Sequence, residues 1–211
     1  MNINLKILEN NKEISDSILA SLSPQVDKYL KKALQKIKKS LPNLIIKLIK
    51  NTPEYNSLIS GQLKYEFGIP NADSAISNII DIWSNNIIIE YNGPVATNNI
   101  IKASFSVSLI RSDYADVLSS NDSLVIDTLR GYQLPWLEWL LLEGNRIIVS
   151  KYEVKLGPSK VSRTGNAIMK SSTKSWKVPS QFSGTSSDNW ITRAIENGED
   201  EINDLLNKAF I

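Results

Sequence analysis

Between residues 23 and 84 the apolar side chains recur every three or four positions, which is the spacing of one face of an α-helix. Two dipeptides in this part of the chain mark helix starts, Ser23-Pro24 and Thr52-Pro53. The hydroxyl group of Ser or Thr caps the first turn, and proline at the first helical position has no N–H bond to lose. The pattern therefore predicts that residues 23–84 are helical.

The boundaries between these helices are set by proline and glycine. The first helix is expected to end, or to be interrupted, near Pro42, because proline in a helix interior removes a backbone hydrogen bond. Residues 43–50, NLIIKLIK, fit a further helical turn as well as a buried strand. After a break at residues 68–70, a third helix is expected from about Asn71 to Trp83.

Residues 1–22 precede the first predicted helix start and are expected to form an N-terminal arm. Ile3, Leu5 and Ile7 alternate with polar residues in its Asn-rich first part, which fits one strand or disorder. Such an arm can reach across a subunit boundary.

After residue 85 the period changes from helical to alternating. Apolar and polar residues alternate strictly from Ile101 to Leu109, as expected for a strand with one solvated face. A turn is expected before this strand at Asn92-Gly93-Pro94. The other strands are expected at residues 87–91, 124–129, 146–156, 167–169 and 176–178. Because the links are too short for parallel crossovers, a mainly antiparallel sheet is predicted within residues 85–180.

The stretch from Gly131 to Gly144, GYQLPWLEWLLLEG, places apolar residues on nearly every side of a short helix. A helix of this kind is buried on most faces, in the core or partly against another subunit. A last helix, residues 187–210, is expected to have Ser187 as its N-cap and a kink at Gly198.

Length and element order point to one domain. The chain has 211 residues, 42% of them hydrophobic, which is enough to bury a core without disulfides. Helices followed by strands and a final helix indicate an α+β fold. We expect residues 23–211 to form this single domain.

The composition excludes several kinds of chemistry. The chain contains no Cys and no His, which excludes disulfides, thiolate nucleophiles, Cys/His zinc sites and a Ser-His-Asp triad. Glu138 and Glu143 point in different directions on a helix and so do not form an acid/base pair, although Arg130 and Arg146 flank them and could pair with them. We therefore expect no catalytic residues, no cofactor, no metal and no enzyme activity.

No apolar run is long enough to cross a membrane, and the first residues lack the apolar core of a signal peptide. We expect a soluble protein that is made in the cytoplasm and does not contact a membrane.

The net charge of +2 is small, but the charges are unevenly distributed. Eight lysines and no acid lie between Lys28 and Lys50, whereas residues 196–204 carry five acids. The lysine face fits a solvated surface, a contact to an acidic partner, or nucleic-acid binding without sequence specificity. In an oligomer, the basic helix of one subunit can pair with the acidic helix of the next.

Three segments resemble structural proteins of tailed-bacteriophage virions: LPWLEWLLLEG (134–144), SRTGNAIM (162–169) and WKVPSQFSGTSSDNWITRAIE (176–196). With residues 55–83 included, the similarity extends over most of the chain and is to small α+β neck or tail-completion proteins, which join head and tail. The Arg-Thr-Gly segment at 163–165 follows a Glu-aromatic segment here, the reverse of the family's order. The resemblance therefore does not decide whether the position in the virion is the neck, the tail terminator or the baseplate.

This resemblance implies a non-enzymatic virion subunit, made in the host cytoplasm, that forms a homo-oligomeric ring, a hexamer or a dodecamer, and contacts other neck or tail proteins. A small nucleic-acid-binding protein that uses the face between Lys28 and Lys50 is the alternative of a different class. The residues expected at interfaces are Lys31, Lys32, Lys38, Lys39, Trp136, Glu138, Trp139, Arg163, Trp190, Glu199 and Glu201.

Overall fold

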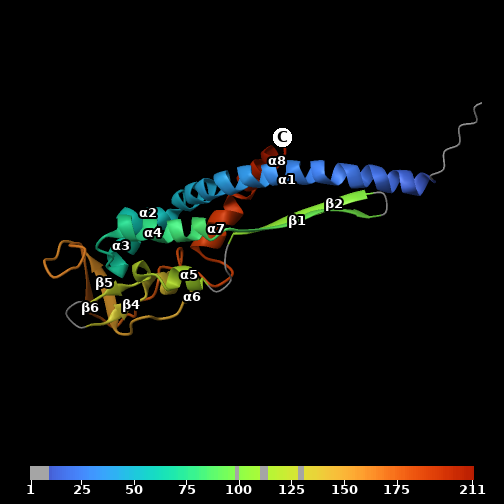
Figure 1. Ribbon diagram of the computed structural model, residues 1–211. Helices are drawn as coiled ribbons and strands as arrows, with labels where there is room; N and C mark the ends of the chain where they lie inside the picture. The colour runs from blue at the N-terminus through green and yellow to red at the C-terminus, as the bar shows by residue number, and fades with distance from the viewer. Residues whose placement is uncertain (1–9, 98–99, 110–113, 128–130) are drawn as a thin grey trace, which may run out of the picture.

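The longest element of the computed structural model is a helix of 40 residues, α1 (Asn11–Lys50), which extends over most of the length of the molecule (Figure 1). The structure describes residues 10–97, 100–109, 114–127 and 131–211. The alternating residues Ile3, Leu5 and Ile7 lie outside the described residues.

The first helix begins at Asn11, so the prediction of a start at Ser23 and of an arm reaching residue 22 was wrong. Asn10 caps the helix: its Oδ1 atom accepts hydrogen bonds from the N–H groups of Lys12 and Glu13, at 3.0 and 2.9 Å. The Glu13 carboxylate accepts one from the Asn10 N–H at 2.8 Å, which completes a capping box. The sequence carried this second start signal upstream of Pro24.

Both prolines lie inside α1. Pro42 is followed by Ile45, Leu48 and Ile49, which are all buried, so residues 43–50 are helix and not a strand. Packing of these side chains outweighs the hydrogen bond lost at the proline.

Three helices follow α1, one more than predicted, because the helix that starts at Thr52-Pro53 is divided at Gly61: α2 (Pro53–Ser60), α3 (Gln62–Phe67) and α4 (Ala72–Asn85). The Thr52 hydroxyl caps α2 by accepting the Tyr55 N–H at 3.2 Å. Gly68 ends α3 in the left-handed conformation, with φ of 68°, which favours glycine. The cap at Thr52 and the break at residues 68–70 are therefore confirmed.

The strands form three separate antiparallel pairs in the described part of the chain. These pairs are β1 (Ile88–Thr97) with β2 (Ile100–Ser108), β3 (Val125–Ile126) with β4 (Gln133–Leu134), and β5 (Tyr152–Leu156) with β6 (Ala167–Ser171). The α+β class and the antiparallel pairing are confirmed. One continuous sheet does not form, because short helices, α5 (Ala115–Leu118) and the 3-10 turn η1 (Asn121–Ser123), intervene.

Three predictions for this part of the chain need correction. The segment 92–94 is not a turn but an irregularity in the register of β1, and β1 continues to Thr97. Neither 146–151 nor 176–178 is a strand: Val149 makes a single bridge to Trp176, and Lys151 has a positive φ of 60° just before β5 begins. Residues 128–129 of the predicted strand 124–129 lie outside the described residues.

The last three helices are α6 (Trp136–Leu142), α7 (Trp190–Asn197) and α8 (Glu199–Ala209). The predicted burial of α6 is confirmed at Trp136, Leu137, Leu140 and Leu141. The predicted kink at Gly198 separates α7 from α8, and α8 packs there against α1. A Cβ atom at this glycine would lie 2.3 Å from Leu48 Cδ1, so a larger residue would force the Leu48 side chain to move.

The N-cap of α7 is Asn189 rather than the predicted Ser187. Its Oδ1 atom accepts hydrogen bonds from Ile191 N at 3.0 Å and Thr192 N at 3.3 Å. Its Nδ2 atom donates to the Tyr114 hydroxyl at 2.7 Å and to Thr185 O at 2.8 Å. Asn189 is fully buried, and its hydrogen bonds join α7 to Tyr114 and to Thr185.

Replacing this side chain is expected to destabilise the fold. Asn189→Ala removes the cap and leaves buried polar groups without their partner, so the free energy of unfolding should fall by about 2–4 kcal/mol. Urea unfolding followed by circular dichroism measures this change. Asn207→Ala, at an exposed position of α8, is the matched control and should cost less than about 1 kcal/mol. Equal losses in the two variants would contradict the role of Asn189.

Candidate assembly surface

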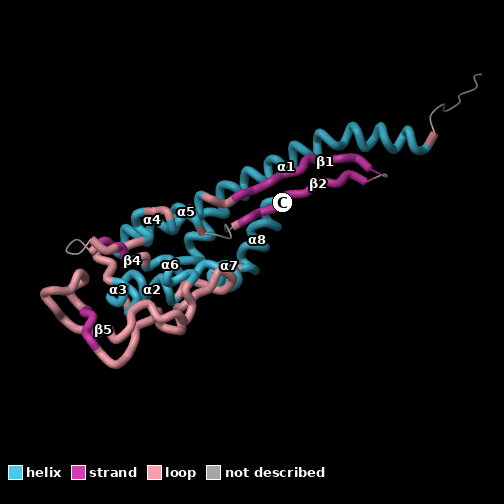
Figure 2. The backbone as a smooth tube through the Cα atoms, turned by 90° about the horizontal axis from the view of Figure 1, so that it is seen from below, coloured by secondary structure: helices cyan, strands magenta, loops and turns pink. Residues whose placement is uncertain are grey.

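The N-terminal half of α1 and the β1–β2 hairpin project together from the rest of the molecule (Figures 1 and 2). We call residues 11–32, β1 and β2 the arm. The buried residues of α1 begin at Ala33, so the helix in the arm is covered much less than its continuation in the body. The helix of the arm therefore receives little support from the body.

Inside the arm, one face of the hairpin lies against α1. The half-buried side chains on this face include Ile89, Tyr91, Phe105 and Val107, which alternate with exposed residues as predicted for residues 101–109. Phe105 also contacts Phe210, with ring centroids 5.3 Å apart. The hairpin is thus held between α1 and the end of the chain.

A hydrogen-bonded group at Asp27 fastens the hairpin to the helix. The Tyr91 hydroxyl donates to Asp27 Oδ1 at 2.8 Å, and Lys31 Nζ lies 2.7 Å from Asp27 Oδ2. The bonds from Lys31 and Tyr91 hold the pKa of the Asp27 carboxyl below its ordinary value. Burial, together with the bond to Asp27, raises the pKa of the Tyr91 phenol.

The outside of the arm carries apolar side chains that nothing in the described chain covers. Ile18 and Leu22 of α1 are 53% and 40% exposed, and Val95 and Ile100 near the end of the hairpin are 62% and 55% exposed. Each strand of the hairpin also has one edge without a neighbouring strand among the described residues. Exposed apolar groups and open strand edges are features of surfaces that pair with another chain.

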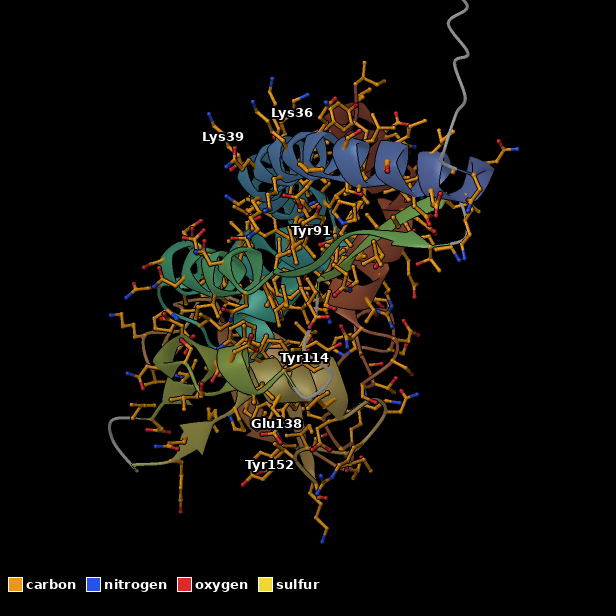
Figure 3. All side chains as sticks on the ribbon, turned by 45° about the vertical axis from the view of Figure 1, so that its right-hand side comes forward. Lys36, Lys39, Tyr91, Tyr114, Glu138 and Tyr152 are labelled. Carbon is orange, nitrogen blue, oxygen red and sulfur yellow. The ribbon has the colours of Figure 1, made fainter. Side chains whose placement is uncertain are left out.

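The predicted lysine candidates lie on α1, where Lys31, Lys32, Lys38 and Lys39 are all exposed. Lys31 pairs with Asp27 of the same helix. Lys39 points away from the body (Figure 3), whereas Lys36 Nζ donates to Ala209 O of α8 at 3.4 Å. The structure therefore leaves Lys32, Lys38 and Lys39 available to a partner.

The acidic candidates lie on α8, which packs beside α1 in the same chain. Glu201 Oε2 is 2.7 Å from Lys47 Nζ, and both side chains are at least half exposed. Glu199 is exposed at the start of α8. The opposite charges meet within one chain, so Glu201 does not need a neighbouring subunit for a partner.

Two of the tryptophan candidates were wrong, because Trp136 and Trp190 are fully buried within the chain. Trp136 Nε1 donates to Asp122 O at 2.9 Å. Trp190 Nε1 donates to the Thr52 hydroxyl at 2.7 Å, and its ring meets Trp83 edge to face at 5.6 Å. The spacing of a helix does not reveal which tryptophan faces inward when apolar residues surround it.

Trp139 and Arg163 line a cleft between the end of α3, α6 and the β5–β6 hairpin, with a volume of about 500 Å³. We call it the aromatic cleft. Its base is Phe67, Trp139 and Trp176, whose ring centroids are 5.9 to 6.5 Å apart. Arg163 lies at its rim, with Nη1 3.6 Å from Asp127 Oδ2.

The remaining candidate, Glu138, is exposed on α6 (Figure 3). Arg146 pairs with Glu143 instead, through Nη1 contacts of 2.8 and 3.0 Å to both carboxylate oxygens, which confirms one of the two expected pairings. Arg130 lies outside the described residues. Glu143 is thus engaged by Arg146, and Glu138 and Glu143 do not form a pair of catalytic carboxylates.

Within the described residues, no group of three or more acidic side chains is placed to hold a metal ion. None of the described helices combines the length and the apolar character that a membrane span requires.

Sequence reasoning missed the two features that now define the surface, the helical arm and the aromatic cleft. The capping box at Asn10 and Glu13, followed by Ile14, Ile18 and Leu22 at helical spacing, is a signal that could have revealed the arm. The cleft brings Tyr65, Tyr132 and Trp176 together from distant parts of the chain, so no pattern of neighbouring residues predicts it.

Acid is expected to loosen the hairpin from α1. Because the pKa of Asp27 is lowered in the folded state, its contribution to stability is complete above about pH 4 and is lost as the pH falls through the lowered value. Amide hydrogen exchange should therefore show that protection factors in β1 and β2 fall as the pH is lowered from about 4 through the lowered pKa of Asp27. Asp27→Asn should remove this part of the pH dependence, whereas Glu90→Gln, an exposed position of β1, should retain it. An unchanged pH dependence in Asp27→Asn would exclude this role of the carboxylate.

Comparison with known proteins gives no significant match for this chain, whether with family models, with curated sequences or with solved structures.

Proposed function

We propose that this chain is a non-enzymatic structural subunit that assembles into a homo-oligomeric ring through its arm. The phage setting, a ring at the neck or tail terminus that joins head and tail, rests on the sequence resemblance. A baseplate or other tail position is the nearest alternative.

The observation that carries the proposal is the arm itself. Residues 11–32 of α1 bury little against the body, and Ile18, Leu22, Val95 and Ile100 stay exposed on it. Among the described residues, α1 and Phe210 cover one face of the hairpin, and the other face stays exposed to water. Contact with a neighbouring subunit would cover both the apolar side chains and the open strand edges, which an isolated subunit leaves in water.

The shape of the molecule favours contacts of the head-to-tail kind. The arm projects from one end, and the β5–β6 hairpin lies at the opposite end (Figures 1 and 2). Residues of this hairpin line the aromatic cleft. A contact between two different surfaces of identical subunits generates a ring when the rotation closes. The separation of the two ends therefore supports a ring better than a two-fold dimer.

The charge distribution weakens the nucleic-acid alternative. Glu201 and the other acids of α8 lie beside the lysines of α1, which lowers the positive potential that phosphate binding needs. Duplex DNA binding that is lost when Lys31, Lys32, Lys38 and Lys39 are changed to Gln, and that falls steeply with salt, would favour this alternative.

Changing the exposed apolar side of the arm is expected to prevent assembly without unfolding the protein. The double variant Ile18→Lys with Leu22→Lys should weaken self-association at least about tenfold, because it places two charges in an apolar contact. Light scattering over a range of concentrations measures the mass of the assembly. Ser17→Lys with Gln25→Lys, at exposed polar positions of the same helix, is the matched control and should assemble normally.

Circular dichroism should give the same thermal melting for both double variants, because none of the four positions is buried. A wild-type protein that stays monomeric at hundreds of micromolar would argue against the proposal, as would equal assembly of the two variants. For the phage setting, a portal or tail-tube gene beside this one is the expected finding.

A further inference from the structure

The aromatic cleft is the second place where the described structure leaves apolar groups uncovered. Val161 and Tyr132 at its rim are 86% and 64% exposed, and Met169 of β6 lines it from the hairpin side. Val154, opposite Met169 in the β5–β6 pair, lines the same wall. The cleft thus has an aromatic base, an apolar wall and an open top.

We propose that the aromatic cleft binds the N-terminal segment of a second copy of this chain, residues 1–9, as a strand added beside β5–β6. This inference rests on the proposed function, because it names the contact that links one subunit to the next. It goes beyond the arm contact in assigning a defined occupant to the cleft.

The sequence of the segment, MNINLKILE, matches the chemistry of the cleft. Ile3, Leu5 and Ile7 alternate with Asn2, Asn4 and Lys6, so an extended conformation puts three apolar side chains on one face. The pair β5–β6 has an open edge on each side in the described structure, and an extended segment can add to such an edge through main-chain hydrogen bonds. The apolar face of the added strand would then cover the base and wall of the cleft.

The distance from the tip of the arm to the aromatic cleft requires that the bound N-terminal segment come from another copy of the chain. The segment joins α1 at Asn10, at the tip of the arm, whereas the cleft lies beyond the other end of α1 (Figure 1). A helix of 40 residues is about 60 Å long at 1.5 Å per residue. Ile3 is within seven residues of Asn10, so it can lie at most about 25 Å from it. The segment therefore cannot reach the cleft of its own chain.

A direct binding experiment tests the site without requiring assembly. A fluorescently labelled peptide, MNINLKILE, is titrated with the full chain, and fluorescence anisotropy reports binding. We expect saturable binding that Met169→Lys weakens at least about tenfold, since the substitution puts a charge on the cleft wall. Val95→Lys, at an exposed apolar position on the arm, is the control and should bind the peptide like the wild type.

The same titration with a peptide in which Ile3, Leu5 and Ile7 are replaced by Asn should show no saturable binding. Absence of binding by the original peptide up to millimolar concentration would overturn the proposal. Equal binding by wild type and Met169→Lys would also overturn it. Met169 is partly exposed on a surface strand, so circular dichroism is expected to show a folded variant.

A second experiment places the contact between chains. The protein has no cysteine, so single substitutions can be cross-linked without background. A mixture of Leu5→Cys and Val161→Cys chains should form a disulfide-linked mixed dimer under mild oxidation, and a mixture of Leu5→Cys and Ile147→Cys chains should not.

The two proposals fail in distinguishable ways. Peptide binding and the Val161 cross-link are expected even if the purified chain forms no ring, in which case only the proposed function is in error. Alternatively, the ring forms normally while the peptide does not bind and the cross-link does not form. That result leaves the proposed function intact and excludes the aromatic cleft as the contact between subunits.

Discussion

The burial of one side of α1 between Ala33 and Ile49 is the interaction on which the rest of the structure depends. Seven residues of this half of the helix are buried, and α4, α7, α8 and the hairpin all pack against the helix. The apolar area that these residues remove from water supplies the main favourable term for the body. It also explains why a proline inside the helix is tolerated, since local hydrogen bonding does not decide the conformation there.

The C-terminal segment closes this core through buried polar contacts. The Thr52 hydroxyl accepts hydrogen bonds from Tyr55 N and from Trp190 Nε1 and donates one to Ile49 O at 2.7 Å. Arg193 Nη1 lies 3.2 Å from Glu54 Oε1, and the Glu54 carboxylate is almost completely buried. Such groups are costly to bury without partners, so each one fixes the position of α7 against the start of α2.

The sequence could predict the parts of this structure whose causes are local. The cap at Thr52, the break at Gly68 and the alternation from Ile101 to Leu109 each depend on a few neighbouring residues, and each is present in the structure. The start at Ser23 was wrong because a stronger local signal at Asn10 was overlooked.

Other features depend on contacts that no short pattern contains. Asn189 rather than Ser187 caps α7 because its amide also reaches Tyr114 and Thr185. The same limit applies to the candidate surface. Trp136 and Trp139 belong to one helix, yet Trp136 is fully buried and Trp139 lines the aromatic cleft. The residues that line the cleft with Trp139 include Tyr65 and Trp176, which are 111 positions apart in the sequence. The exposed lysines were predicted correctly because a charged helix face needs no tertiary partner to lie in water.

Because α1 is one continuous helix, its N-terminal half moves with its C-terminal half. Its C-terminal half is clamped in the core, and residues 11–32 extend about 33 Å further at 1.5 Å per residue. A tilt of roughly 5° at the clamped end would therefore displace the tip by about 3 Å, enough to change which side chains meet there. Because no loop separates the two halves, a tilt of the buried half moves residues 11–32 with it.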